Sequence, residues 1–555
     1  MKSKWAKLIS ALVLVAMVLT GCSSGNGSTE TGGTETGGET AKTIPTSDVV
    51  KGETNQQTYP LVEEKITFNY WFPHGSSMAN LADYNDGEFW QWYEELTNVH
   101  VDFTVPATGT EAEAFNLLFM TDKLPDIMYV QTNSQKYRDG MDACIEDGFI
   151  VDMMDYLEYA PNYVSWINSI EGADKAVLTD TGKMYGMWTF WDNMKDGYAD
   201  QGISIRQDFL DKVGMEVPTT YAEWETVLTA FKDELGIEAP FYTGKYGIDN
   251  GEFMAGYGIA PYFYQVDGQI KYGPMEDAYK DYLTMMNDWY KKGLLDPDFD
   301  TRQSSGIAAD NDMILNDKIG ALIDYGTRMT DAYISRGATN TEFWAVAAPQ
   351  PKLEGGADPA WFMAGTNFNN MQQVCILISA ECEDIETAVR WVDGFYAKDI
   401  YLNANYGIDS EKDIVWYEAE DGHRIGDYDF RYSNPDGLDS GTVLVKYWTK
   451  NPPVRVEAAQ IEQMPAERAV AYDIWSQYKP VNFIPNNISM TADEGNEYAQ
   501  YYTEIDLYVK EMNVKFIKGT ASLDDYDAYR DELTKMGIQT CIDLQQAALD
   551  RYNAR

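Results

Sequence analysis

The chain has 555 residues, and its 89 Asp and Glu against 42 Lys and Arg give a formal net charge of −47. A field of that sign repels nucleic acid and anionic lipid head groups, which excludes both as favourable partners. The length exceeds what one hydrophobic core holds, so we expect at least two lobes.

The first residues have the three-part layout of a secretory signal peptide. Three lysines precede an apolar run over residues 8–19, which is too short for a stable membrane-spanning helix. The run leads into the sequence LTGC, which ends at Cys22 and matches the bacterial lipobox. We therefore expect residues 1–21 to be removed as a lipoprotein signal peptide and Cys22 to be lipidated. The mature protein would lie at the extracellular face of the cytoplasmic membrane, lipid-anchored in the Gram-positive manner.

The segment after the lipobox has the composition of a linker. Residues 23–40 contain only Gly, Ser, Thr, Asn and Glu, and such a stretch cannot bury enough apolar surface to order itself. The first apolar cluster begins near Tyr59. We therefore assign residues 22–62 to a lipid-anchored flexible linker.

Strand and helix patterns alternate from about residue 65. Strands are expected over residues 66–71, 99–105 and 124–130, and helices over residues 89–96 and 115–119. This βαβαβ order predicts a parallel sheet covered by helices. In such sheets ligands bind outside the carboxyl ends of the strands. The loops after Tyr70 and Val130 are therefore candidate walls of a binding site.

A second α/β unit begins near Ile203. Thr220 and Glu223 have the spacing of a capping box, which predicts a helix that starts there, and Gly293 is placed to end another helix. The other elements expected are strands over 203–206, 318–324 and 375–379 and helices over 208–213, 276–292 and 385–396.

The cysteines beyond the lipobox show no CxxC pairing and no regular spacing, which argues against a disulfide framework or a zinc site. They are Cys144, Cys375, Cys382 and Cys541. We expect them to be buried and unpaired. A disulfide between Cys375 and Cys382 is the alternative.

Catalytic signatures are absent from the sequence. There is no GxSxG, no GxGxxG after a strand, no GxxxxGK, and with three histidines no HExxH. Asp296, Asp298 and Asp300 lack the Gly and Glu of an EF-hand loop, so we interpret them as a helix terminus and loop. The sequence therefore predicts a protein that is not an enzyme and has no metal or cofactor. Because carboxylates are so numerous, a glycosidase pair among them stays open as an alternative.

Several segments together resemble the extracellular solute-binding lipoproteins of ABC importers. The resemblance is to the carbohydrate-type family related to maltose-binding protein and to the LipO-like lipoproteins of Gram-positive bacteria. Its most specific stretch runs from Ile205 to Trp224 and begins IRQDFLDKVG. The other segments are LPDI at 124–127, GFIVD at 148–152, GKMYG at 182–186, GLLDPDF at 293–299 and NDKIGA at 316–321.

The resemblance implies the α/β, two-lobed fold of type II periplasmic binding proteins. Each lobe would be a mainly parallel sheet flanked by helices, with a hinged cleft between the lobes. Residues 63–187 plus about 371–430 would form the N-terminal lobe, and about 192–365 plus about 440–555 the C-terminal lobe. The implied function is capture of an oligosaccharide in the cleft and its delivery to the transmembrane subunits of an ABC permease. We expect a monomer that reaches the membrane through its lipid anchor only.

A sugar ring has apolar C–H faces and a polar rim, so its site needs flat rings and directional polar groups. Aromatic residues make up 14% of the chain, more than a core needs. The resemblance places ligand contacts in the loops after the strands and in the crossings between lobes. The expected ligand-binding residues are Trp71, His74, Gln131, Trp188, Trp191, Asp324, Tyr325, Arg328, Trp361, Asn367 and Phe368.

Other interpretations of these residues stay open at this point. Each tryptophan could pack in the core, and the polar residues could cap helices or pair with each other. A surface lipoprotein glycosidase would show a rigid site with two carboxyls at a defined separation. The same fold could also bind a peptide or another nutrient, or serve in sensing.

Overall fold

The computed structural model describes most of the chain beyond residue 41. The described residues are 42–73, 83–120, 123–132, 134–138, 140–192, 198–199, 201–251, 253–302, 311–325, 340, 342–359, 366–367, 371–408, 414–418, 424–428, 445–449, 451–456, 466–475, 477, 482–485 and 487–555. They form two α/β lobes, each with its own sheet and hydrophobic core.

The first lobe is built on a six-stranded sheet in the order β16-β4-β13-β3-β1-β2. Its strands are β1 (Ile66–Trp71), β2 (Val99–Thr104), β3 (Ile127–Gln131), β4 (Met187–Asp192), β13 (Met371–Ile378) and β16 (Val454–Val456). β1 is parallel to both β2 and β3, while β13 is antiparallel to β3 and β4. Helices α1 (Glu88–Thr97) and α2 (Glu111–Leu118) connect β1, β2 and β3. The predicted βαβαβ unit is confirmed.

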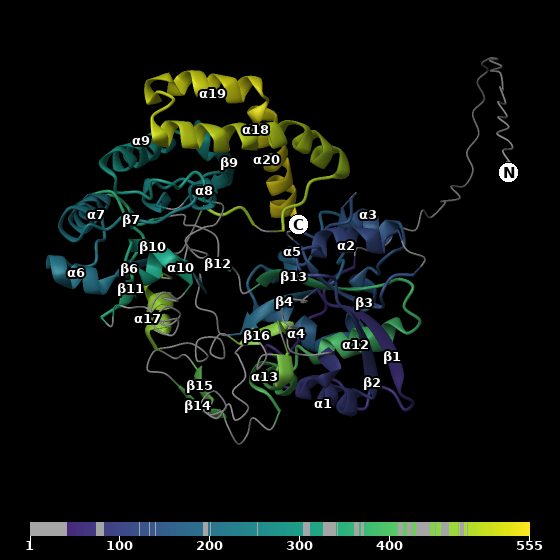
Figure 1. Cartoon of the computed structure of the whole chain (residues 1–555). Helices are drawn as coiled ribbons and strands as arrows, with labels where there is room; N and C mark the ends of the chain where they lie inside the picture. The colour runs from purple at the N-terminus through teal and green to yellow at the C-terminus, as the bar shows by residue number, and fades with distance from the viewer. Residues whose placement is uncertain are drawn as a thin grey trace, which may run out of the picture. The chain divides into compact units, whose positions relative to one another are not determined.

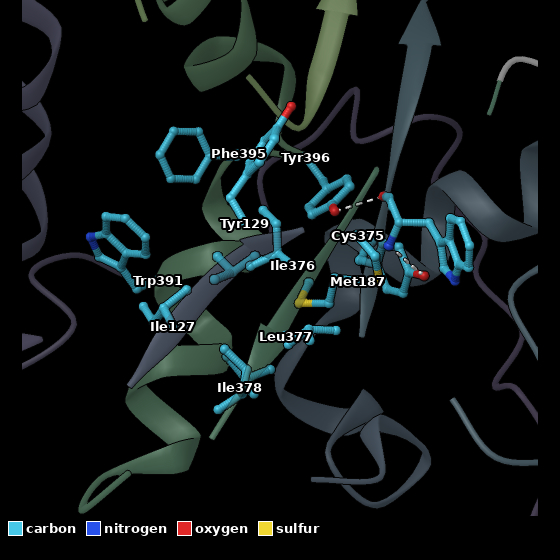
Figure 2. Packing of buried hydrophobic residues seen from close by; sticks show 14 of the residues in the cluster. Ile127, Tyr129, Met187, Cys375, Ile376, Leu377, Ile378, Trp391, Phe395 and Tyr396 are labelled. Atoms are coloured by element: carbon cyan, nitrogen blue, oxygen red, sulfur yellow. Dashed lines mark hydrogen bonds between the residues drawn. The ribbon is translucent and has the colours of Figure 1, made fainter. Parts of the chain in front are cut away.

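Aromatic and aliphatic side chains pack together in the core of this lobe (Figure 2). The apolar face of α1 buries Phe89, Trp90 and Tyr93 against α12 (Ile385–Gly394), where Trp90 and Trp391 stack with ring centroids 6.2 Å apart. Just beyond α12, the Tyr396 hydroxyl donates to the Trp188 carbonyl oxygen at 2.7 Å. The helix predicted over 385–396 therefore binds the sheet through rings and through this hydrogen bond.

The second lobe is built on a four-stranded sheet in the order β11-β6-β10-β7. Its strands are β6 (Gln201–Arg206), β7 (Ala239–Phe241), β10 (Ile319–Tyr325) and β11 (Ala345–Ala347). β10 is parallel to β7, but β6 is antiparallel to both of its neighbours. Parallel neighbours need a helical crossover, which the helices between β7 and β10 supply. The sheet is therefore mixed, whereas the sequence predicted a mainly parallel one.

The predicted helices of the second lobe form with their expected ends. α6 (Gln207–Val213) ends at Gly214 and α9 (Asp277–Lys292) at Gly293, both glycines in the left-handed conformation. The capping box of Thr220 and Glu223 begins α7 (Tyr221–Leu235). The C-terminal part consists of α18 (Ala492–Lys518), α19 (Tyr526–Lys535) and α20 (Ile538–Ala554), and α18 packs on α9 (Figure 1).

The remaining elements are shorter. The helices are α3 (Met141–Glu146), α4 (Pro161–Ser169), α5 (Ala173–Ala176), α8 (Lys245–Asp249), α10 (Asn311–Leu315), α13 (Lys398–Tyr406) and α17 (Ala466–Trp475). The strands are β5 (Tyr198–Ala199), β8 (Phe263–Val266), β9 (Gln269–Tyr272), β12 (Thr366–Asn367), β14 (Ile414–Glu418) and β15 (Arg424–Tyr428).

Residues 42–62, which the sequence analysis assigns to the flexible linker, are fastened to the first lobe, and we call them the N-terminal arm. The amide of Gly52 donates to Ser165 Oγ at 2.8 Å, and its carbonyl accepts from the Lys398 amide at 2.9 Å. Gly52 has a φ of 63°, and a Cβ there would collide with the Tyr396 carbonyl. The assignment of 42–62 to a linker is therefore corrected, because hydrogen bonds to distant residues hold a segment that has no periodic pattern.

Residues 445–456 also lie elsewhere than the sequence analysis places them. The expected boundary near 440 puts them in the C-terminal lobe, yet Val445, Trp448 and Val454 belong to the first core. β16 pairs in parallel with β4 at the edge of the first sheet. Residues 445–456 therefore belong to the first lobe, and the chain reaches the second lobe at α17, which contacts β6 and β11.

The four cysteines beyond the lipobox are buried and free, and Cys375 and Cys382 form no disulfide. Burial raises the pKa of the Cys144 thiol to about 12 and that of Cys541 to about 11. These thiols therefore behave as small apolar side chains of the two cores. Within the described ranges, no helix is long and apolar enough to cross a membrane.

Candidate functional site

The ends of strands from both sheets converge at one place, which we call the junction. It comprises the end of β4, all of β5, the start of β6, the end of β10, all of β12 and the start of β13. Tyr325 pairs with Gln201, Asn367 pairs with Tyr198, and Met371 pairs with Phe190. These three registers bring together segments that are far apart in the sequence.

The first sheet presents further predicted residues along the same edge. Because β13 is antiparallel to both β3 and β4, the carboxyl ends of β1, β3 and β4 lie on one side of the sheet. Trp71 ends β1 and pairs with Met128, while Gln131 ends β3 and pairs with Val374 of β13. This is the edge where ligands bind in sheets of this kind.

The three tryptophans predicted to contact ligand in this lobe are at most 2% exposed: Trp71, Trp188 and Trp191. Trp71 packs with its ring centroid 5.7 Å from that of Phe115, and the Arg455 guanidinium lies 5.4 Å from the Trp191 ring. The Trp188 ring lies 5.4 Å from that of Tyr185. Their rings are packed within the first lobe in this structure, and a contact with ligand stays a prediction.

Other predicted residues lie outside the described part of the chain. These are Cys22, His74, Arg328, Trp361 and Phe368. For Asp324, Tyr325 and Asn367 the structure describes the backbone only. Their strand pairing places all three at the junction.

A charged contact that the sequence analysis missed fixes the end of β4. Asp192 is buried, and its carboxylate accepts from the Tyr401 hydroxyl at 3.2 Å and lies 3.5 Å from Lys51 Nζ. The same ammonium lies 5.5 Å from the centre of the Trp166 ring. Lys51 belongs to the N-terminal arm, and no local pattern pointed to it.

A cavity of about 210 Å³ lies in the second lobe, between α18, β9 and the end of α8. The chain enters α8 from the carboxyl end of β7, which pairs with β10 in parallel. Asn513 is buried in the cavity wall, and its Oδ1 accepts from the Tyr279 hydroxyl at 3.1 Å. The lining combines rings, carboxylates, amides and an ammonium group: Asp249, Asn250, Pro261, Tyr262, Tyr272, Tyr502, Asp506, Val509, Lys510 and Asn513. The lining residues come from scattered parts of the sequence, which explains why the sequence did not reveal this cavity.

The carboxylates that invited a calcium interpretation are engaged by basic side chains. Asp296 is buried and bound by Arg302, and Asp300 accepts from Lys518 Nζ at 2.6 Å. Residues 296–300 follow α9 as a loop, which confirms that interpretation. Among the described residues, no group of His, Cys, Asp or Glu side chains is arranged to hold a metal ion.

Two α/β lobes, joined by strands whose ends meet at a junction, define the fold of the chain as a two-lobed α/β fold. A crystal structure of an extracellular solute-binding protein from Bifidobacterium longum subsp. infantis has the same fold, with a TM-score of 0.68 at 17% identity over 88% of this chain and 98% of that one. No family model matches the chain.

The sequence relatives narrow the class further. The fructooligosaccharide ABC transporter substrate-binding protein FusA of Streptococcus pneumoniae is 23% identical over 530 residues, which cover 90% of this chain and 92% of FusA. Lipoprotein LipO of Bacillus subtilis is 24% identical over 249 residues, 42% of this chain and 46% of LipO. The chain is thus similar in sequence to a substrate-binding protein of an ABC transporter over nine tenths of its length, and to a lipoprotein over a shorter part.

Proposed function

We propose that this protein captures an oligosaccharide at the junction of its lobes and delivers it to the permease of an ABC importer. The observation that carries the proposal is the convergence of strand ends from both sheets on one place. FusA, named for fructooligosaccharide, matches nine tenths of the chain. That match supports a carbohydrate ligand and an importer as partner.

Capture would follow from the chemistry of the residues that the sequence analysis predicts to contact ligand. Trp188, Trp191, Tyr325 and Trp361 would offer flat apolar faces, while His74, Gln131, Asp324, Arg328 and Asn367 would bond hydroxyls. Contacts that exist only when both lobes meet the ligand shift the population toward a closed form. Release to the permease then requires only that the lobes reopen, so no covalent chemistry is needed.

A thermal-shift screen over oligosaccharides of different composition and length tests the ligand class. A carbohydrate that raises the midpoint of unfolding in proportion to its occupancy would support the proposal. If only peptides raise it, the ligand class is wrong although the fold stands. New reducing ends formed in proportion to protein would indicate the glycosidase instead.

Calorimetry on Trp188→Ala, Trp191→Ala and Trp361→Ala then tests the position of the site. Loss of a stacking ring should weaken binding by about 2–4 kcal/mol, as at a binding hot spot. Near-UV circular dichroism must show that each variant is folded. Trp344→Ala is the matched control, because Trp344 is 37% exposed and precedes β11, whose pairing with β6 lies at the end remote from the junction. Parental affinity in all three variants would mean that the rings serve packing alone.

A further inference from the structure

The C-terminal helix of the second lobe is bonded to the first lobe by a group of charged side chains. We call Asp180, Glu494, Arg551 and Arg555 the Asp180 cluster. Asp180 follows α5 in the first lobe, whereas Glu494 lies on α18 and Arg551 on α20, helices of the second lobe. Figure 1 shows the C-terminus beside α5.

Arg555 is the centre of the contact. Its side chain is 4% exposed, and its Nε and Nη2 donate to Asp180 Oδ1 at 2.9 and 2.6 Å. The remaining donors of the guanidinium reach the carbonyl oxygens of Lys175, Leu178 and Asn487. All five N–H groups of this guanidinium thus have acceptors, and four of the five donate to atoms of the first lobe.

Arg551 completes the cluster from one turn earlier on α20. Its Nε donates to Asp180 Oδ2 at 2.9 Å, and its two terminal nitrogens donate to the two Glu494 oxygens at 2.9 and 2.6 Å. Burial alone would raise the pKa of Asp180, but the hydrogen bonds from Arg551 and Arg555 outweigh it and lower that pKa. The carboxylate is therefore fully charged under neutral conditions.

This contact is separate from the chain crossings at the junction. The segments involved, 175–180 and 487–555, are not those that run between the sheets at β4 to β6 or at β12 to β13. Two bodies that are joined by chain crossings at one place and by a bonded cluster at another cannot rotate freely. The cluster must either break or lie on the axis of rotation.

We propose that the Asp180 cluster is the pivot about which the two lobes move, and that it stays bonded in the open and the closed forms. Breaking it would leave the buried Arg555 guanidinium and the Asp180 carboxylate without their partners, which is strongly unfavourable for charges removed from water. The pivot would confine opening to one rotation and so preserve the alignment of the two halves of the site. This inference rests on the proposed function only in supposing that the lobes move.

The test measures the distance between the lobes without ligand, so that it is independent of what the protein binds. Spin labels are attached at Leu117→Cys on α2 and Leu507→Cys on α18, which are 59% and 64% exposed. Cys22→Ser removes the lipobox thiol, and the four other native thiols are buried. We expect Asp180→Asn to broaden the distance distribution and to lengthen its mean relative to the parent.

Arg530→Gln is the matched control. Arg530 also pairs with two carboxylates, those of Asp277 and Asp527, but these are exposed to solvent and all three residues lie within the second lobe. The distribution of label-to-label distances in Arg530→Gln should equal that of the parent. In Asp180→Glu, which keeps the carboxylate, the width of that distribution should be close to the parental width. Should Asp180→Asn fail to fold, removal of Arg555 alone takes away the same bonds from the other lobe. An unchanged distribution, or one that narrows at a shorter distance, would overturn the pivot.

Discussion

Asp393 shows how one buried side chain ties together three parts of the first lobe. It lies in α12, and its carboxylate accepts from Gln57 of the N-terminal arm and from Asn162 and Tyr163 at the start of α4. Complete burial nevertheless raises its pKa from 3.8 to about 7, because loss of water outweighs the hydrogen bonds. The native protein therefore takes up a proton at this residue at a higher pH than the unfolded chain does.

Because of Asp393, the free energy of unfolding should increase as the pH falls from 8 to 5.5. Since the pKa in the folded state lies above that in the unfolded state, the stabilising contribution is fully present below about pH 4 and is lost as pH rises through about 7. The parent should gain about 2 kcal/mol from this group between pH 8 and 5.5. Chemical denaturation of the parent and of Asp393→Asn at both pH values isolates the effect. Equal pH dependence in the two proteins would contradict the shifted pKa.

Elements whose signals are local could be predicted from the sequence. The alternation of apolar residues predicted β1 and β2, helical spacing predicted α1, and capping residues located the start of α7 and the end of α9. The junction could not be predicted in detail, because it depends on pairing between strands such as β5 and β12 of only two residues each. The N-terminal arm gave no signal either, since side chains such as Ser165, more than a hundred residues away, hold it.

The capping box of α7 allows a test of what a single helix end contributes to stability. Thr220→Ala removes the acceptor of the Glu223 amide, which lies 3.3 Å from Thr220 Oγ1, and should destabilise the second lobe by about 1 kcal/mol. Thermal unfolding measures the change. Thr226→Ala is the control on the same helix, since its hydroxyl bonds only the Ala222 carbonyl, and it should alter stability by about 0.5 kcal/mol or less. Equal effects of the two substitutions would show that the cap contributes nothing.

At the scale of the whole molecule, the lipobox predicts a protein held at the cell surface by a lipid on Cys22. The two cores are separate, so each lobe can move as a body while its interior stays packed.

Replacing Cys22 by Ser tests the anchor. Without the thiol no lipid can be attached, so the variant should be secreted or should keep its signal peptide. Fractionation of cells followed by mass spectrometry of the N-terminus distinguishes the two. Ser23→Ala, next to the lipobox, is the control and should stay attached to the membrane. Unchanged attachment of Cys22→Ser would contradict the assignment.

The bonds between the N-terminal arm and the first lobe determine which lobe bears a force applied to the N-terminal end of the chain. Force applied upstream of residue 42 first meets the ion pair of Lys42 with Asp155 and the hydrogen bond from Asn168 to the Pro45 carbonyl, and then the bonds of Gly52 and Gln57, all within the first lobe. The second lobe has no part in those bonds, so it is mechanically unloaded. If Cys22 is lipidated and the lobes move as proposed, the first lobe is therefore the one attached directly to the tether, and the second lobe moves relative to it.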